Sequence, residues 1–189
     1  MPRGLEPYLE PGFLDPASCA RIRAAMDLGA PEPAEILRNG VGLDQGVRSA
    51  WQLEVDAGTL AFVESRLESR RATLSEWFSR PLAAREGAGC LRYGPGGFYR
   101  PHRDRGVDPE WPGAARRQVA LVLFLTSGDG APGGGCRGGA LRLLDGSGEQ
   151  PDVEVLPARG SLVAFAADTL HEVARVHEGT RDVVVDWFY

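Results

Sequence analysis

The sequence contains no lysine: all 21 of its basic residues are arginine. It has 26 acidic residues. The resulting net charge of -5 gives no general electrostatic attraction to nucleic acid or to an anionic membrane surface. We interpret the arginine bias itself as coding composition rather than chemistry. The charge balance therefore predicts neither a nucleic acid nor a membrane as partner.

Cysteine and long hydrophobic runs are also scarce. The cysteines Cys19, Cys90 and Cys136 are odd in number and lack CxxC spacing, which indicates free thiols rather than a disulfide framework or a zinc site. The longest apolar run, 119–125, is far too short to span a bilayer, and the initial MPRGLEPYLEPG lacks the apolar segment of a signal peptide. These absences favour a soluble, cytoplasmic protein.

The length of 189 residues, 43% of them apolar, predicts one domain over 1–189. Its first part, 1–87, is expected to supply supporting helices and a lid. Asp15-Pro16 predicts the start of a helix that ends near Gly29, and the apolar spacing over 59–80 is typical of one long amphipathic helix. Between these helices, 36–38 and 47–55 have strand character around the glycine-rich NGVGLDQG.

The second part, 88–189, consists of short apolar runs separated by glycines, a pattern typical of a β-sandwich or jelly roll. The glycine-rich SGDGAPGGGCRGG, 127–139, is expected to be a flexible loop. The fold class is therefore mainly β, a jelly roll with N-terminal helices packed on its major sheet. The expected strands are 88–93, 98–103, 117–126, 139–144, 151–156, 161–165, 170–176 and 181–188.

The stretch LRYGPGGFYRPHRD places His102 and Asp104 two residues apart at the end of a strand-like segment. Residues i and i+2 of an extended chain point to the same face, so the two side chains can reach one metal ion. His171, in FAADTLHEV, is the candidate third ligand. Two histidines and one carboxylate form the facial triad of non-haem Fe(II) oxygenases. His177 has no partner at ligand spacing and is assigned to the surface.

These motifs carry a family resemblance over about residues 88–189. The order Tyr93, HxD, GGxL, HEV and, ten residues after His171, Arg181 ahead of VVVDWFY resembles the 2-oxoglutarate and Fe(II)-dependent oxygenases, and within them the prolyl 4-hydroxylase-like group. The resemblance implies a double-stranded β-helix and the cosubstrates 2-oxoglutarate and O2, and it leaves open whether ascorbate serves as reductant. Because Asp104 occupies the carboxylate position, the resemblance implies hydroxylation rather than halogenation.

The resemblance also implies roles for residues outside the triad. Arg181 would bind the 5-carboxylate of 2-oxoglutarate, a task that suits a planar, permanently charged guanidinium. The two-residue period places Arg181 on an apolar face, which independently indicates an anionic partner. Tyr93 would donate its hydroxyl to the cosubstrate, with a core tyrosine as the alternative. Phe124 departs from the transcription-factor prolyl hydroxylases, which have a tyrosine at this position.

The expected substrate is a prolyl residue in a peptide or protein. A lid over 39–51, facing the 127–139 loop across the mouth of the barrel, would bring Arg48 and Trp51 to the peptide; an ordinary hairpin connection is the alternative. A tailoring hydroxylase of a free amino acid or small metabolite would use the same iron site. A third alternative is a non-catalytic jelly-roll binding module. This hypothesis accounts for the strands but not for the set of metal and cosubstrate ligands.

Overall fold

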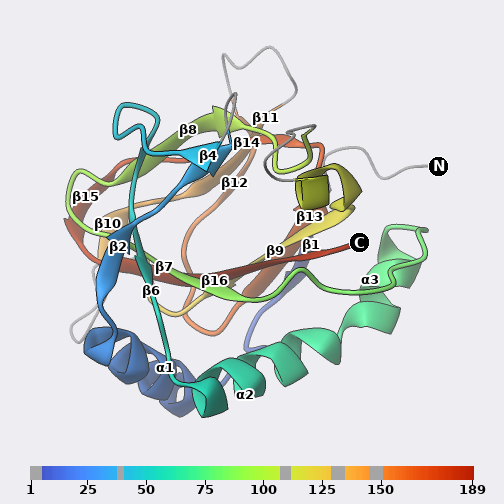
Figure 1. Cartoon of the computed structure of the whole chain (residues 1–189), viewed down its shortest axis with the longest axis horizontal. Helices are drawn as coiled ribbons and strands as arrows, with labels where there is room; N and C mark the ends of the chain where they lie inside the picture. The colour runs from blue at the N-terminus through green and yellow to red at the C-terminus, as the bar shows by residue number, and fades with distance from the viewer. Residues whose placement is uncertain (1–5, 38–40, 107–111, 129–134, 145–150) are drawn as a thin grey trace.

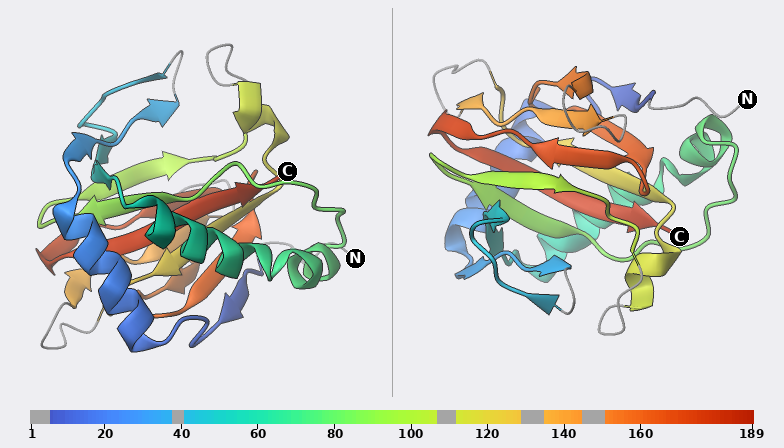
Figure 2. Two further views of the ribbon diagram at one scale, coloured as in Figure 1. Left: turned by 60° about the horizontal axis from the view of Figure 1, so that its bottom comes forward. Right: turned by 90° about the horizontal axis from the view of Figure 1, so that it is seen from above.

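The computed structural model describes residues 6–37, 41–106, 112–128, 135–144 and 151–189. The fold is built around two antiparallel sheets that face each other, with helices covering the outer face of the larger one (Figures 1 and 2). The larger sheet has the order β1 (Tyr8–Glu10), β13 (Leu162–Ala166), β9 (Val119–Phe124), β16 (Arg181–Phe188), β7 (Gly89–Tyr93), β6 (Trp51–Leu53) and β2 (Pro31–Pro33).

The smaller sheet has the order β12 (Pro151–Val155), β11 (Leu141–Leu144), β14 (Leu170–Val173), β8 (Phe98–His102) and β5 (Arg48–Ser49). Two further antiparallel pairs join β10 (Cys136–Gly138) to β15 (Val176–Gly179) and β3 (Ile36–Leu37) to β4 (Val41–Gly42). The expected mainly-β jelly roll with N-terminal helices is confirmed.

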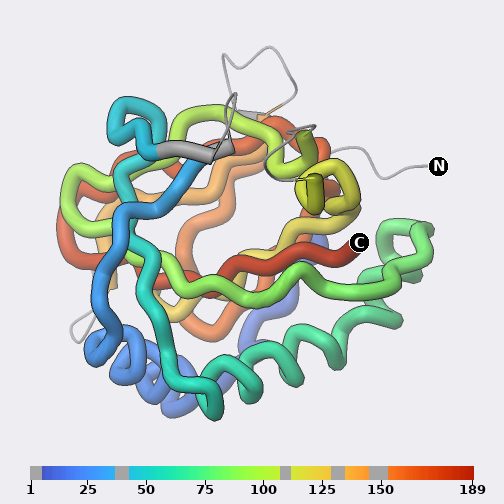
Figure 3. The backbone as a smooth tube through the Cα atoms, viewed as in Figure 1, coloured from blue at the N-terminus to red at the C-terminus, as the bar shows by residue number. Residues whose placement is uncertain are grey.

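Two apolar cores lie on opposite sides of the larger sheet. In β9 the side chains alternate, so Val119, Leu121 and Leu123 pack toward the helices while the intervening residues pack toward the smaller sheet. Strand β16 runs between β7 and β9 through the middle of this sheet, as the trace in Figure 3 shows. A strand that is covered on both faces is apolar throughout, which explains the unbroken sequence VALVLF in β9.

The first helix, α1 (Pro16–Leu28), begins and ends where the sequence predicts. The Asp15 side chain accepts a hydrogen bond from the backbone N–H of Ser18, which satisfies one of the unpaired donors at the helix start. Gly29, at its other end, has extended backbone rather than a left-handed cap. Glycine is required there because a Cβ would lie 2.1 Å from the backbone oxygen of Glu54.

The prediction of one continuous helix over 59–80 is wrong. The chain forms α2 (Ala57–Glu68) and α3 (Arg71–Trp77), with a turn between them. At this turn the Ser69 hydroxyl donates to the backbone oxygen of Arg66 at 2.5 Å, so a side chain competes with the helical backbone pattern. Arg70 then reaches across to bind both carboxylate oxygens of Glu10 in β1.

Two expectations for the loops and strands also need correction. The strand expected over 170–176 is divided into β14 and β15, which belong to different sheets. The 127–139 segment, expected to be a flexible loop, contains β10, which exists because its backbone pairs with β15 despite its glycines. Residues 129–134 of that segment, and residues 39 and 40 of the expected lid, lie outside the described residues. None of the helices in the described part of the chain has the length and apolar character needed to cross a bilayer.

Candidate metal and cosubstrate site

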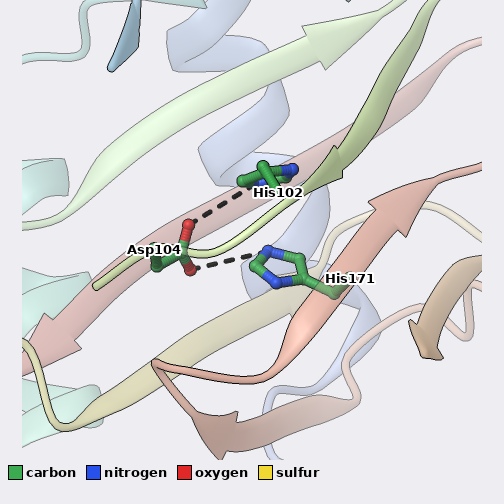
Figure 4. A group of neighbouring side chains, drawn as sticks. All are labelled: His102, Asp104 and His171. Carbon is green, nitrogen blue, oxygen red and sulfur yellow. Dashed lines mark ion pairs between the residues drawn. The ribbon is translucent and has the colours of Figure 1, made fainter. Parts of the chain in front are cut away.

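Neighbouring strands β8 and β14 of the smaller sheet bring His102, Asp104 and His171 together, as Figure 4 shows. His102 ends β8 and stands directly opposite His171 of β14 in the antiparallel register. The Nε2 atom of His102 lies 3.5 Å from Oδ1 of Asp104, and Nε2 of His171 lies 3.6 Å from Oδ2 of the same carboxylate. The three side chains offer ligand atoms that all lie within 4.8 Å of one another.

Backbone carbonyls fix which nitrogen of each imidazole faces the carboxylate. Nδ1 of His102 lies 2.8 Å from the Arg100 oxygen, and Nδ1 of His171 lies 2.9 Å from the Thr169 oxygen. A carbonyl only accepts hydrogen bonds, so Nδ1 of each ring carries a proton and Nε2 is the nitrogen that faces Asp104. Two imidazole nitrogens and a carboxylate that face one another form a donor set that suits a divalent cation.

The electrostatics of the three groups agree with that arrangement. Burial, reinforced by the neighbouring His102 ring, lowers the pKa of His171 to about 4, so this imidazole is neutral at physiological pH. Burial alone would raise the pKa of Asp104, but the two imidazoles and a hydrogen bond from Trp187 outweigh it and hold the carboxyl pKa well below its usual range. An ionised Asp104 and a neutral His171 are the protonation states that metal coordination requires of these two groups.

Aromatic rings support the triad on two sides. The ring of Tyr99 stacks on His102 with a centroid separation of 3.5 Å, and Phe165 packs edge-on against His171 at 4.7 Å. Burial raises the pKa of the Tyr99 hydroxyl to about 12, so Tyr99 remains neutral. Sequence reasoning assigned no role to either residue. The available signal for Tyr99 was its position three residues before His102 in the same motif.

The same cavity, of about 110 Å³, contains Arg181, Tyr93 and Arg48 together with the triad. Arg181 is 1% exposed, and its Nε donates to the Gly139 backbone oxygen at 2.8 Å. Gly139 has φ +72°, and a Cβ there would lie 2.9 Å from Cδ of Arg181, so glycine makes room for this side chain. The odd-numbered residues of β16, from 181 to 187, all line the cavity, as the two-residue period predicts.

Arg181 has a cationic head without an acidic partner. Its guanidinium carbon lies 5.0 Å from the ring centroid of Tyr93 and 5.2 Å from that of Phe124, and no described carboxylate forms an ion pair with it. Burial lowers the pKa of Arg181, which is the direction expected for a desolvated cation. Tyr93, 2% exposed, is the direct cross-strand neighbour of Arg181 between β7 and β16.

The two residues expected to contact substrate are separated by the structure. Arg48 lines the cavity with its guanidinium carbon 4.6 Å from the Tyr99 ring centroid. Its Nη1 donates to the Glu35 backbone oxygen at 2.7 Å, whereas its buried Nε has no partner among the residues described. Trp51 is 45% exposed and lies outside this cavity, against a neighbouring hollow that Arg48 also lines. His177 is exposed in β15, apart from the triad.

Comparison with known proteins places these observations in a family. Residues 88–189 match the model of the 2OG-Fe(II) oxygenase superfamily. The chain is 31% identical over 96 residues to a PKHD-type hydroxylase of Maricaulis maris, and 35% identical over 97 residues to one of Acaryochloris marina. Each alignment covers 51% of this chain and 38% of the relative, so the chain spans well under half the length of these relatives.

Solved structures share the fold over nearly the whole chain. A Pseudomonas putida prolyl-4-hydroxylase superposes with a TM-score of 0.71 at 24% identity, over 97% of this chain and 92% of that one. A Trichoplax adhaerens prolyl hydroxylase, in complex with a hypoxia inducible factor peptide fragment, gives a TM-score of 0.75 at 17% identity, over 97% and 83%. At these identities the comparison establishes the common fold.

Proposed function

The chain belongs to the 2OG-Fe(II) oxygenase superfamily, and on this premise we propose that it is an Fe(II)- and 2-oxoglutarate-dependent dioxygenase that hydroxylates a C–H bond. The proposed target is a prolyl residue in a peptide or protein, and the proposed by-products are succinate and CO2. One observation carries the proposal. Arg181, a buried cation with no acidic partner in the described chain, opens into the cavity that holds the His-Asp-His triad.

The triad residues fit the role of metal ligands. His102 and His171 would bind through Nε2, because their Nδ1 protons are held by backbone carbonyls, and Asp104 would supply the carboxylate oxygen. When bound, Fe(II) with 2-oxoglutarate and O2 supplies the oxidising chemistry of hydroxylation. The chain contributes the orientation of the ligands and an apolar lining, which includes Phe165 and Val183, that keeps water from the reacting atoms.

Arg181 and Tyr93 fit the role of cosubstrate anchors. The Nε of Arg181 is committed to Gly139, and no described residue accepts from its two terminal nitrogens. Those nitrogens can bind both oxygens of a carboxylate in the planar geometry that arginine favours. The Tyr93 hydroxyl stands beside this group on the neighbouring strand and can donate a further hydrogen bond to the cosubstrate.

The substrate assignment rests on Arg48 and on the structural relatives. Arg48 lines the cavity that contains the triad, and its buried Nε has no partner among the described residues, so an acceptor on the substrate, such as a peptide carbonyl, would satisfy this side chain. The Trichoplax adhaerens relative was captured with a peptide fragment. A peptide is therefore the substrate class that we propose, and a free amino acid is the outcome that would replace it.

The experiment measures succinate formation from 2-oxoglutarate by purified protein with Fe(II), with and without ascorbate, alone and with proline-containing peptides or free amino acids. Mass spectrometry then searches each reaction for a product that has gained one oxygen. Alanine replacement of His102, Asp104 or His171 should abolish Fe(II) binding and turnover, whereas His177→Ala should preserve both. Equal loss in the His177 variant, or intact Fe(II) binding in all three triad variants, would overturn the proposed site.

A further inference from the structure

The Asp104 carboxylate receives a hydrogen bond that sequence reasoning missed. Nε1 of Trp187 donates to Oδ2 of Asp104 at 2.9 Å. Trp187 lies on the cavity face of β16, six residues after Arg181, so the strand that carries the proposed cosubstrate anchor also reaches the metal carboxylate. An indole nitrogen donates only, and this contact therefore occupies an acceptor site on one particular oxygen.

A buried ion pair holds Trp187 in place. The guanidinium carbon of Arg117 lies 3.8 Å from the centroid of the Trp187 ring, and Arg117 pairs through Nε and Nη2 with both carboxylate oxygens of Glu86. Arg117 is 3% exposed, and its Nη1 also donates to the backbone oxygen of Asp104 at 3.2 Å. One planar group thus fixes both the indole and the main chain of the residue that the indole contacts.

The two oxygens of Asp104 are consequently unequal. Oδ2, the oxygen nearer His171, accepts the hydrogen bond from Trp187. Oδ1 faces the imidazole of His102, and no other described side chain or backbone N–H donates to it. A hydrogen bond withdraws electron density from the oxygen that accepts it and fixes the plane of the carboxylate. Both effects favour coordination through Oδ1 alone.

We propose that Trp187 is a positioning residue that makes Asp104 a single-oxygen ligand and thereby keeps one metal position open. This inference rests on the proposed metal site. A metal with about six coordination positions has about three left after two imidazoles and one carboxylate oxygen. A cosubstrate that chelates through two atoms then leaves one for O2. A carboxylate that bound through both oxygens would fill that last position.

The test counts water on bound Mn(II), which substitutes for Fe(II) without turnover, from the broadening of its electron paramagnetic resonance lines in ¹⁷O-enriched water. Wild-type protein should hold about three exchangeable waters, and Trp187→Phe, which keeps an aromatic ring and loses the donor, about two. After addition of 2-oxoglutarate, wild type should retain about one and the variant none. An unchanged water count in the variant would overturn the inference.

Two further samples keep the result interpretable. Replacement of residue 187 by β-(3-benzothienyl)alanine preserves the ring shape and exchanges the N–H for sulfur, so it should reproduce the Phe result even if Trp187→Phe folds poorly. Trp77→Phe, at the end of α3 and packed against Tyr8, is the matched control and should match wild type. If wild type itself fails to bind Mn(II), the proposed function fails; if it binds and the variants match it, only the role of Trp187 fails.

Discussion

At the level of single residues, Arg181 is a buried charge whose unfavourable burial has a functional reason. Removing a guanidinium from water is costly, and a buried cation ordinarily has an acidic partner that offsets the cost. Among the described residues, Arg181 has instead two aromatic rings and one carbonyl oxygen around it. The unmet charge is retained in the folded protein, where an anion from solution can pair with it.

Replacement of Arg181 by alanine should therefore weaken 2-oxoglutarate binding by roughly 2 to 4 kcal/mol, the range for removing one partner of a buried charge pair. Mn(II) affinity should stay close to that of wild type, because Arg181 makes no contact with the triad side chains. Calorimetric titration under anaerobic conditions measures both constants. Arg137→Ala, at an exposed position of β10, is the matched control, and an unchanged 2-oxoglutarate affinity in Arg181→Ala would move the anchor elsewhere.

Arg48 and Trp51 make a second prediction, because they line different hollows that meet at Arg48. Arg48→Ala should reduce substrate-stimulated turnover with every substrate, since Arg48 lines the cavity that contains the triad, while slow uncoupled succinate formation continues. Trp51→Ala should reduce turnover only with peptides long enough to extend past Arg48. Steady-state kinetics with one short and one long proline peptide separate the two. If both variants match wild type and a free amino acid reacts fastest, the peptide proposal is wrong.

At the scale of elements, β16 shows what the sequence can and cannot predict. The alternation in RDVVVDWF predicted which residues share the face of Arg181, because a strand has a fixed period of two. The hydrogen bond from Trp187 to Asp104 was not predictable, since it depends on how β16 lies relative to the residues that follow β8. The pairing of His102 with His171 likewise depends on strand register, which no local pattern specifies.

The helices also show that a local sequence pattern cannot predict long-range contacts. Leu67 and Leu74 are both buried against the same core, so their spacing fits a continuous helix and the apolar pattern alone could not reveal the turn between α2 and α3. At the turn the Ser69 hydroxyl donates to the backbone oxygen of Arg66, and Arg70 pairs with Glu10, a residue 60 positions away. Local periodicity thus predicted the buried face, whereas the long-range contact made at the turn could not be derived from it.

Neighbouring residues of β16 should give opposite results when each is replaced by alanine. Asp182 is fully buried on the helix side and accepts hydrogen bonds from Arg92 at 2.7 and 3.0 Å and from Arg23 at 2.9 Å. Asp182→Ala should lower the free energy of unfolding by about 3 kcal/mol, the low end for breaking a buried ion pair, because both arginines keep contact with water. Urea unfolding measures this loss.

The same variant should bind 2-oxoglutarate nearly as wild type does at temperatures where it remains folded, because Asp182 faces away from the cavity. Arg181→Ala, one residue earlier, should show the reverse: weak cosubstrate binding with little loss of stability. A large loss of 2-oxoglutarate affinity in Asp182→Ala would contradict the separation of the two faces.

At the scale of the whole molecule, the family match and the site occupy different shares of the chain. The family model covers residues 88–189, which include the triad and Arg181, whereas Arg48 comes from the part before it. That earlier part also supplies α1 and α2, whose buried side chains complete the core behind the larger sheet. The similarity to solved prolyl hydroxylases extends over 97% of the chain, so the N-terminal part belongs to the shared fold.

The lack of lysine makes the alkaline stability of this protein unusually simple to interpret. Lysines normally titrate near pH 10, but in their absence the side chains that ionise at alkaline pH are the thiols and the tyrosines. Burial raises the pKa of Cys19 and of Cys90 to about 11 from an ordinary value of 9.0. Both thiols therefore stay protonated in the folded protein at a pH where they ionise in the unfolded chain.

A raised folded-state pKa contributes stability that is present below pH 9 and is lost as the pH rises toward 11. At pH 10 each thiol should have lost roughly 1.4 kcal/mol, the equivalent of one pKa unit, so the pair should lower the free energy of unfolding by about 3 kcal/mol relative to pH 8. Urea unfolding under reducing conditions at both pH values measures the difference. Cys90→Ala should lower stability at pH 8 as well, through the cavity it creates, yet it should remove the roughly 1.4 kcal/mol of pH-dependent loss that Cys90 causes. A variant that loses as much stability between pH 8 and pH 10 as wild type does would show that other groups cause the alkaline loss.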